Sequence, residues 1–189
     1  MQGVGEYSDE HEALGLLVEA DRGSLPFALL HGEALVACAA WALGEAGLTQ
    51  VDLGTPWEAL VEAGEPFVLH DPLCPMTPAD FLVACLERCE AEQAVVVGTR
   101  PVTDTLKGLD PQGYVGEGVD RDTVLQVTSP VVLPATVVAA LDGMPSTDFA
   151  TLVGVLAERF PVVAATAPPE GRRVADESDV RLLEAFTAR

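Results

Sequence analysis

The chain has 189 residues, a length that suits one α/β domain and is sufficient to bury a sizeable core. Apolar residues make up 49% of it and the mean hydropathy is +0.28, which argues against global disorder. The net charge of −20 repels nucleic acid and anionic membranes, and no apolar run is long enough to span a bilayer. With no secretory signal pattern at the start, we expect a cytoplasmic protein with neither a nucleic-acid nor a membrane partner.

The predicted elements alternate between strands and helices. Residues 1–12 are polar and are predicted to form a flexible tail ahead of a single domain over residues 13–189. Strands are predicted at residues 13–20, 50–53, 66–70, 93–98, 123–128 and 161–165. Helices are predicted at residues 33–45, 56–63, 77–91, 134–141, 148–159 and 176–187. This alternation predicts an α/β fold with a mostly parallel sheet and one or two helical layers.

Two local patterns refine this assignment. Thr77 is predicted to cap a helix, with Pro78 in the first turn and Asp80 at the positive end of the helix dipole. Residues 101–121 contain four glycines and two prolines, too many for a packed helix, so this segment is predicted to be an extended arm or hairpin.

Four cysteines are present: Cys38, Cys74, Cys85 and Cys89. Cys85 and Cys89 lie four positions apart on a predicted helix, a spacing that can bind a metal ion. No histidine or second cysteine pair lies nearby, so buried core thiols are the preferred interpretation. Reduced thiols fit a cytoplasmic protein.

Three segments resemble the 2-C-methyl-D-erythritol 4-phosphate cytidylyltransferase family. Residues 67–75 read FVLHDPLCP, similar to the family's strand-end pattern His-Asp-Ala-Ala-Arg-Pro. Residues 101–107 read PVTDTLK and are followed by VDRD at 119–122 and TSP at 128–130, similar to the family's Pro-Val-x-Asp-Thr-[Ile/Met]-Lys, Val-Asp-Arg and Thr-Pro. Residues 169–179 resemble, more weakly, the segment before the family's last helix. The resemblance implies a Rossmann-like nucleotidyltransferase domain with a projecting β-arm.

The resemblance also implies roles for individual residues. Asp71 matches the family's metal-associated aspartate, which holds Mg²⁺ at the end of a strand. Thr105 and Arg121 match positions that contact the sugar phosphate from an arm reaching into the neighbouring subunit of a homodimer. Asp104 and Lys107 belong to the same motif and are expected to shape the arm. Two alternatives stay open: Asp71 as an ordinary turn residue before proline, and the arm as a solvated hairpin with ordinary surface charges.

The chain also departs from the family pattern. The family's first strand is followed by a Gly-rich loop and a Pro-Lys pair that cradle the triphosphate of CTP. Here residues 20–27 shorten that loop, and Phe27 follows Pro26 where the lysine is expected. Cys74 replaces the arginine of the strand-end motif, and the segment that receives the cytosine is missing between residues 51 and 65. Arg22 and Arg173 are the remaining candidates for phosphate clamps.

Two functions from different classes follow from these matches. The first is a homologue with weak or no catalysis that binds a sugar phosphate, or that partners an active enzyme. The second is an active cytidylyltransferase that transfers CMP from CTP to a sugar-alcohol phosphate, using Mg²⁺ and a nucleotide site rebuilt from Arg22, Arg173 and backbone amides, with Asp71 as the metal ligand. Another nucleotide or sugar phosphate on the same fold is a third alternative.

Overall fold

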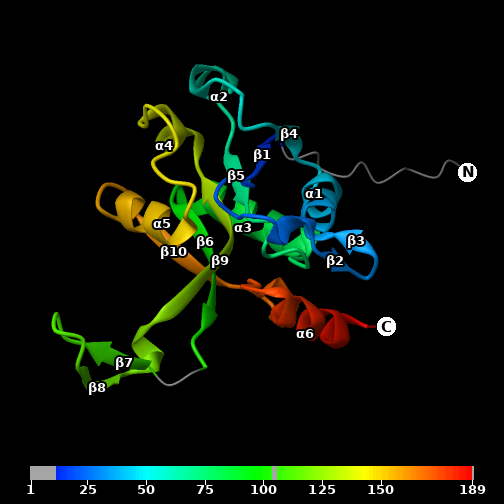
Figure 1. The fold of residues 1–189 in the computed structure, drawn as a ribbon. Helices are drawn as coiled ribbons and strands as arrows, with labels where there is room; N and C mark the ends of the chain where they lie inside the picture. The colour runs from blue at the N-terminus through cyan, green and yellow to red at the C-terminus, as the bar shows by residue number, and fades with distance from the viewer. Residues whose placement is uncertain (1–11, 104–105, 189) are drawn as a thin grey trace, which may run out of the picture.

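The computed structural model describes residues 12–103 and 106–188. Its centre is a six-stranded sheet in the order β10-β6-β9-β5-β1-β4 (Figure 1). The strands are β1 (Leu14–Leu17), β4 (Thr49–Val51), β5 (Phe67–His70), β6 (Val95–Pro101), β9 (Leu125–Leu133) and β10 (Val162–Thr166). Only β9 runs antiparallel to its neighbours β5 and β6, while β1 pairs in parallel with β4 and β5, and β6 with β10. The predicted α/β fold with a mostly parallel sheet is confirmed.

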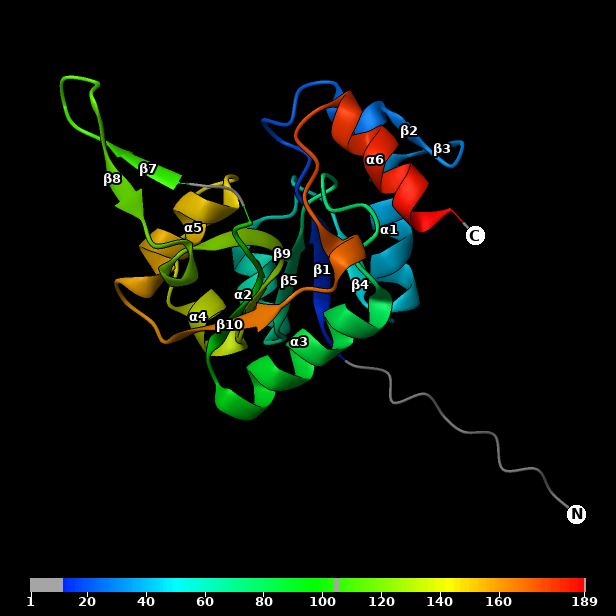
Figure 2. The same ribbon diagram turned by 90° about the horizontal axis from the view of Figure 1, so that it is seen from below.

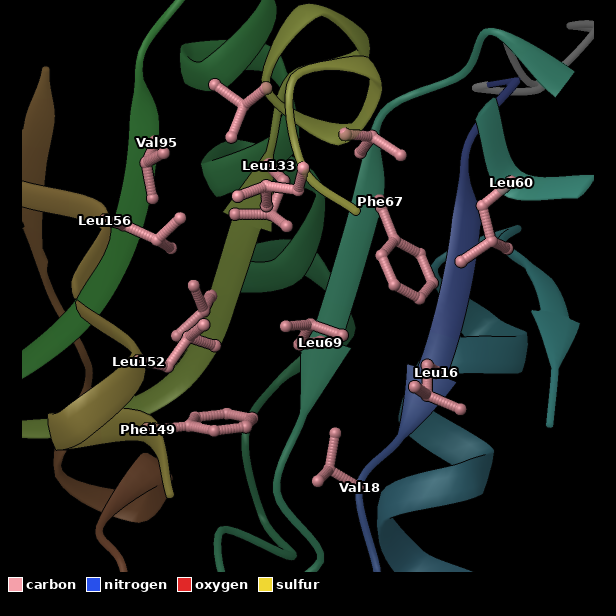
Figure 3. Close-up of a cluster of buried hydrophobic side chains, with 14 of the residues drawn as sticks. Leu16, Val18, Leu60, Phe67, Leu69, Val95, Leu133, Phe149, Leu152 and Leu156 are labelled. Carbon is pink, nitrogen blue, oxygen red and sulfur yellow. The ribbon is translucent and has the colours of Figure 1, made fainter. Parts of the chain in front are cut away.

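Helices cover both faces of this sheet. The helices on one face are α1 (Leu35–Glu45) and α3 (Ala79–Glu92), and those on the other are α2 (Trp57–Ala63), α4 (Ala135–Ala139) and α5 (Phe149–Ala157). Side chains alternate along β5, so Phe67 and Leu69 pack towards α5 while Val68 packs towards α3. Figure 3 shows the first of these clusters, where Leu152 and Leu156 of α5 lie over the strands. Burial on both faces explains why the central strand β5 and the first half of β6 read as apolar runs.

A smaller cluster joins the last helix, α6 (Glu177–Thr187), to a hairpin of β2 (Leu29–Leu30) and β3 (Glu33–Ala34). The side chain of Asp176 accepts hydrogen bonds from the backbone N–H groups of Ser178 and Asp179 and so caps this helix, whose position was predicted. The hairpin was not predicted, because two-residue strands leave no alternating pattern in the sequence. Three short 3₁₀ turns complete the fold: η1 (Leu25–Phe27), η2 (Arg121–Thr123) and η3 (Pro169–Gly171).

The prediction for Thr77 was wrong. The side chain of Thr77 donates a hydrogen bond to the carbonyl oxygen of Cys74 at 2.9 Å, and Pro78, which has no capping side chain, occupies the cap position of α3. The threonine therefore stabilises the loop that precedes α3 rather than the helix itself.

The predicted arm contains two antiparallel strands, β7 (Leu106–Leu109) and β8 (Val115–Val119). Figure 1 shows this hairpin projecting from the end of the sheet. Asp104 and Thr105, which the sequence places at the base of the arm, lie outside the described residues. No helix within residues 12–103 and 106–188 is long and apolar enough to cross a membrane.

One glycine fixes how closely β6 approaches β9. A Cβ atom added to Gly98 would lie 2.3 Å from the carbonyl oxygen of Ser129, a distance that no side chain tolerates. The pairing of the two strands shifts register between Val97 and Thr99, at this point of close approach. Gly98 therefore allows β9 to bring Ser129 against the end of β5, where the site described next begins.

Candidate functional site

A cluster of three charged side chains lies at the carboxyl ends of β1 and β5. Asp71 follows the last residue of β5, and Arg22 lies in the short loop after β1. The two strands are parallel neighbours, so their ends meet at one edge of the sheet, where open α/β sheets bind ligands. Arg173 reaches the same point from the segment between η3 and α6.

Both carboxylate oxygens of Asp71 are paired with arginine. The Nε of Arg22 donates to Oδ1 at 3.0 Å, and the Nε of Arg173 donates to Oδ2 at 3.0 Å. The side chains of Arg22 and Asp71 are only 5% and 2% exposed, whereas that of Arg173 is 32% exposed. The Arg22–Asp71 pair is therefore buried, and Arg173 closes the cluster at its solvent side.

Each of the three guanidinium nitrogens of Arg22 donates a hydrogen bond inside the protein. Beyond the bond to Asp71, Nη1 donates to the carbonyl oxygen of Ala20 at 3.0 Å and Nη2 donates to that of Thr147 at 2.7 Å. Its Cζ also lies 5.9 Å from the centre of the Phe149 ring, a cation–π distance. All three nitrogens are occupied, so Arg22 is fixed in place. Within the described residues, by contrast, the two terminal nitrogens of Arg173 have no hydrogen-bond partner.

A polar layer behind Asp71 orients its backbone. The hydroxyl of Ser129 accepts a hydrogen bond from the N–H of Asp71 at 3.1 Å and shares another with Nδ1 of His70. His70 is fully buried, and this burial lowers its pKa to about 4, although the negative charge of Asp71 opposes the shift. The ring is therefore neutral at neutral pH.

The loop after β5 is a hydrogen-bonded turn. The carbonyl oxygen of Asp71 accepts from the N–H of Cys74 at 2.9 Å, and its Oδ1 accepts from the N–H of Leu73 at 3.0 Å. Asp71 thus occupies the turn that the sequence offered as an alternative and also belongs to the charged cluster. Burial, and then the charge of Asp71, raise the pKa of the Cys74 thiol well above its usual value, so Cys74 carries no charge.

A second carboxylate lies close to the two arginines. The pKa of Asp148 is lowered, first by its hydrogen bonds with Thr151 at the start of α5 and to a smaller extent by the charges of Arg22 and Arg173. Asp148 therefore helps to balance the charges of the two guanidinium groups. Next to it, the Thr147 hydroxyl donates to Oδ2 of Asp21 at 2.7 Å and fixes the β1 loop against α5.

The side chains of this cluster do not suit Mg²⁺ as ligands. The ion prefers near-octahedral oxygen coordination, whereas both oxygens of Asp71 already accept from guanidinium groups, whose charge opposes a dication. Within residues 12–103 and 106–188, no group of three or more His, Cys, Asp and Glu side chains is arranged to hold a metal ion. Cys85 and Cys89 are buried, and burial raises the pKa of each thiol to about 12, as expected of core thiols.

A hollow of about 580 Å³ lies at the carboxyl ends of β1 and β4, and none of Arg22, Asp71 and Arg173 lines it. Its lining includes Leu17, Val51 and the acidic residues Glu19 and Asp52, and it contains no lysine or arginine. Such a surface repels a polyphosphate.

The arm residues behave differently from the buried cluster. Lys107 and Arg121 are exposed, and within the described residues Arg121 donates one hydrogen bond, from Nη1 to the carbonyl oxygen of Thr103 at 3.0 Å. The other two predicted residues of this motif, Asp104 and Thr105, lie outside the described residues.

The sequence singled out Asp71, Arg22 and Arg173 separately, and the structure brings them together. It did not single out the side chains that surround them, Ser129 and Asp148. Ser129 stands in a quoted motif, but its contact with Asp71 depends on the antiparallel pairing of β5 with β9. A polar residue before an apolar helix was the available signal for Asp148.

Comparisons with known proteins agree with this architecture. No protein-family model matches the chain. It is 34% identical over 124 residues to the 2-C-methyl-D-erythritol 4-phosphate cytidylyltransferase of Symbiobacterium thermophilum, covering 61% of this chain and 50% of that protein. It is 30% identical over 125 residues to the enzyme of the same name from Nocardia farcinica, covering 65% and 54%. The chain thus spans about half the length of these two relatives.

A third relative is matched over a shorter stretch. The chain is 39% identical over 84 residues to the bifunctional enzyme IspD/IspF of Clavibacter michiganensis, covering 44% of this chain and 20% of that protein.

Solved structures share the fold. The 4-diphosphocytidyl-2C-methyl-D-erythritol synthase of Anaerococcus prevotii superposes with a TM-score of 0.72 at 15% identity, covering 96% of this chain and 100% of that one. The 2-C-methyl-D-erythritol 4-phosphate cytidylyltransferase of Thermus thermophilus gives 0.69 at 20% identity, covering 93% and 98%. The fold is therefore that of the α/β nucleotidyltransferases. Taken with the sequence matches, this makes the chain a homologue of the 2-C-methyl-D-erythritol 4-phosphate cytidylyltransferases over about half of their length.

Proposed function

We propose that this chain is a cytidylyltransferase homologue with weak or no catalysis. The observation that carries the proposal is the closed cluster in which Arg22 and Arg173 occupy both oxygens of Asp71. Nucleotidyl transfer depends mainly on positioning two anions and on cations that stabilise the crowded oxygens. Here the carboxylate that the family resemblance assigns to the metal is already neutralised by the protein itself.

The β1 loop supports the same proposal. Phe27, whose residue is 64% exposed, stands where the lysine is expected, and Asp21 adds a negative charge to the loop. Arg22, the remaining cation of this loop, is only 5% exposed and each of its three nitrogens already donates to an internal partner, so it is poorly placed to meet a triphosphate. Loss of one such electrostatic clamp costs about 3–4 kcal/mol of transition-state stabilisation, or roughly two to three powers of ten in rate. Two missing clamps would leave little activity.

The arm supports the binding part of the proposal. Lys107 and Arg121 are exposed cations, and within the described residues the guanidinium of Arg121 donates a single hydrogen bond, so it can meet a phosphate. We infer that the chain forms a homodimer through the arm and binds a sugar phosphate there, in the cytoplasm. Leu109, Tyr114 and Val115 leave large apolar side chains exposed on this hairpin, as expected of a surface that another subunit covers.

One observation favours the active alternative. The terminal nitrogens of Arg173 donate no hydrogen bond to the described residues, and this side chain is partly exposed. Arg173 could therefore serve as a single phosphate clamp while its Nε holds Asp71. A working CTP site would still need Arg22 to leave three internal partners, and a metal to displace at least one guanidinium.

The test is pyrophosphate release from CTP, 2-C-methyl-D-erythritol 4-phosphate and Mg²⁺ at high protein concentration. The Thermus thermophilus enzyme serves as the positive control. An Asp71→Asn variant, purified identically and checked for folding by circular dichroism, reports release by contaminating host enzyme. We expect the wild type and the variant to give the same background. Release by the wild type that is lost in Asp71→Asn would overturn the proposal and establish an active enzyme.

A further inference from the structure

A groove of about 630 Å³ lies on another part of the surface, between α1, the loop of residues 75–78 and η3. Figure 2 shows α1 meeting the N-terminal end of α3, which this loop enters. None of Arg22, Asp71 and Arg173 lines the groove, so it is separate from the cluster described above.

One face of α1 forms an apolar wall of this groove. Cys38, Trp41 and Ala42 all line it, and Trp41 and Ala42 follow Cys38 by three and four residues, which places both beside Cys38 on the helix surface. Trp41 is 73% exposed, an unusual position for the largest apolar side chain. Met76 faces it from the loop before α3. The groove therefore offers an aromatic and a flexible thioether side chain, a combination suited to holding an apolar anchor.

Carboxylates surround this apolar wall. Glu33, Glu45, Asp80 and Glu170 all line the groove, and no lysine, arginine or histidine does. Within the described residues none of the four forms an ion pair, whereas other surface carboxylates such as Glu92 do. An uncompensated acidic rim attracts cations and repels nucleic acids, anionic lipids and the acidic surface of a second copy of the chain.

The dimensions of the groove favour a polymer over a small ion. Glu33 and Glu45 flank the two ends of α1, whose 11 residues span about 16 Å. A metal ion or a compact ammonium ion cannot reach both ends, whereas about five residues of an extended peptide can. Residues 1–11 of the chain itself contain Glu6, Asp9 and Glu10 and no lysine or arginine, so they have the wrong charge.

We propose that this groove binds a basic segment of a partner protein, with an apolar side chain on Trp41 and Met76 and with lysine or arginine side chains at the carboxylate rim. Cation–π contact with the exposed indole adds to the attraction for such a segment. The interface is small and its charges are exposed, so binding weakens as salt screens them.

The probe is a fluorescein-labelled peptide of alternating leucine and lysine, twelve residues long, with its glutamate counterpart as the charge control. Fluorescence anisotropy measures its affinity for the full chain at low and high salt. The double variant Glu33→Gln/Glu45→Gln is compared with Glu58→Gln/Glu62→Gln, which removes the same charge from exposed positions on α2. We expect about a fivefold loss of affinity in the first variant and less than about twofold in the second, as for two exposed ion pairs.

Trp41→Ala tests the apolar anchor. Its exposed side chain contributes little to stability, so the thermal midpoint is expected to stay close to that of the wild type while peptide affinity falls about fivefold or more. Equal losses in the groove and α2 variants, or equal binding of the glutamate peptide, would show only a general attraction to the acidic surface and overturn the proposal.

Cys38 provides an independent footprint. It is the one partly exposed cysteine of the four, since Cys74, Cys85 and Cys89 are buried. Burial and the charge of Glu33 raise its pKa, so labelling with a maleimide is run at about pH 8, where enough thiolate forms. Saturating lysine peptide is expected to slow labelling at Cys38 severalfold, with Cys38→Ser as the blank. An unchanged rate would place the peptide elsewhere and sink the proposal.

Discussion

The buried strand-end cluster and the exposed arm carry charged residues under opposite physical conditions. Asp71 is 2% exposed in its side chain and has both oxygens paired with arginine. Lys107 and Arg121 are exposed, and within the described residues Arg121 donates one hydrogen bond, to a backbone carbonyl oxygen. A buried charge must be compensated within the protein, which fixes it in place, whereas an exposed charge keeps its capacity for a ligand. Matching residue types in the two motifs therefore do not imply matching functions.

Removing Arg22 gives the largest expected effect. The Arg22→Ala variant leaves a buried carboxylate with one partner, and breaking a buried ion pair in this way costs about 3–5 kcal/mol of unfolding free energy. Urea denaturation measures the loss. Glu92→Ala, which breaks the exposed pair with Arg88, is the matched control and is expected to cost less than about 1 kcal/mol. Similar small losses in both variants would mean that Asp71 is not held as the structure indicates.

The next largest expected effect is the pH dependence of stability that comes from the neutral imidazole of His70. Its pKa is about 4 in the folded chain, below the usual value near 6.5, so the unfolded state binds the proton more readily. The contribution of the neutral His70 to the free energy of unfolding is therefore fully present above about pH 6.5, and it is lost as the pH falls towards 4. A pKa shift of this size corresponds to about 3 kcal/mol of unfolding free energy.

The pH effect is measured as the difference in unfolding free energy between the wild type and His70→Gln from pH 7 to pH 4. The glutamine variant removes the titration while keeping a polar side chain beside Ser129. The wild type is expected to lose more stability than the variant as the pH falls. Parallel curves would show that the histidine charges in the folded state without cost.

Much of the fold was predictable, because strands such as β5 and β6 are buried on both faces and read as unbroken apolar runs. The cap of α6 was predictable from Asp176, since that interaction is local. The charged cluster was not, because Arg22 and Asp71 lie 49 positions apart and Asp71 and Arg173 lie 102 apart. Sequence spacing does not encode which loops meet at one edge of a sheet. The resemblance named all three residues but assigned them to a ligand rather than to one another.

A substitution in the arm is expected to give the smallest change in stability, and it contrasts most sharply with a substitution in the buried cluster. The Tyr114→Asp variant alters a side chain that is 74% exposed, so the unfolding free energy of the subunit is expected to change by less than about 0.5 kcal/mol.

The same substitution places a charge in the proposed dimer contact, which is costly when another subunit covers it. Analytical ultracentrifugation is therefore expected to show a dimer for the wild type and a shift towards monomer for Tyr114→Asp. Leu182→Asp makes the same change of charge at a 53% exposed position on α6 and is expected to stay dimeric. A monomeric wild type, or equal dissociation of both variants, would remove the arm from the interface. The cluster at Asp71 would then be stable within a single subunit, and the exposed cations of the arm would be left for a ligand alone.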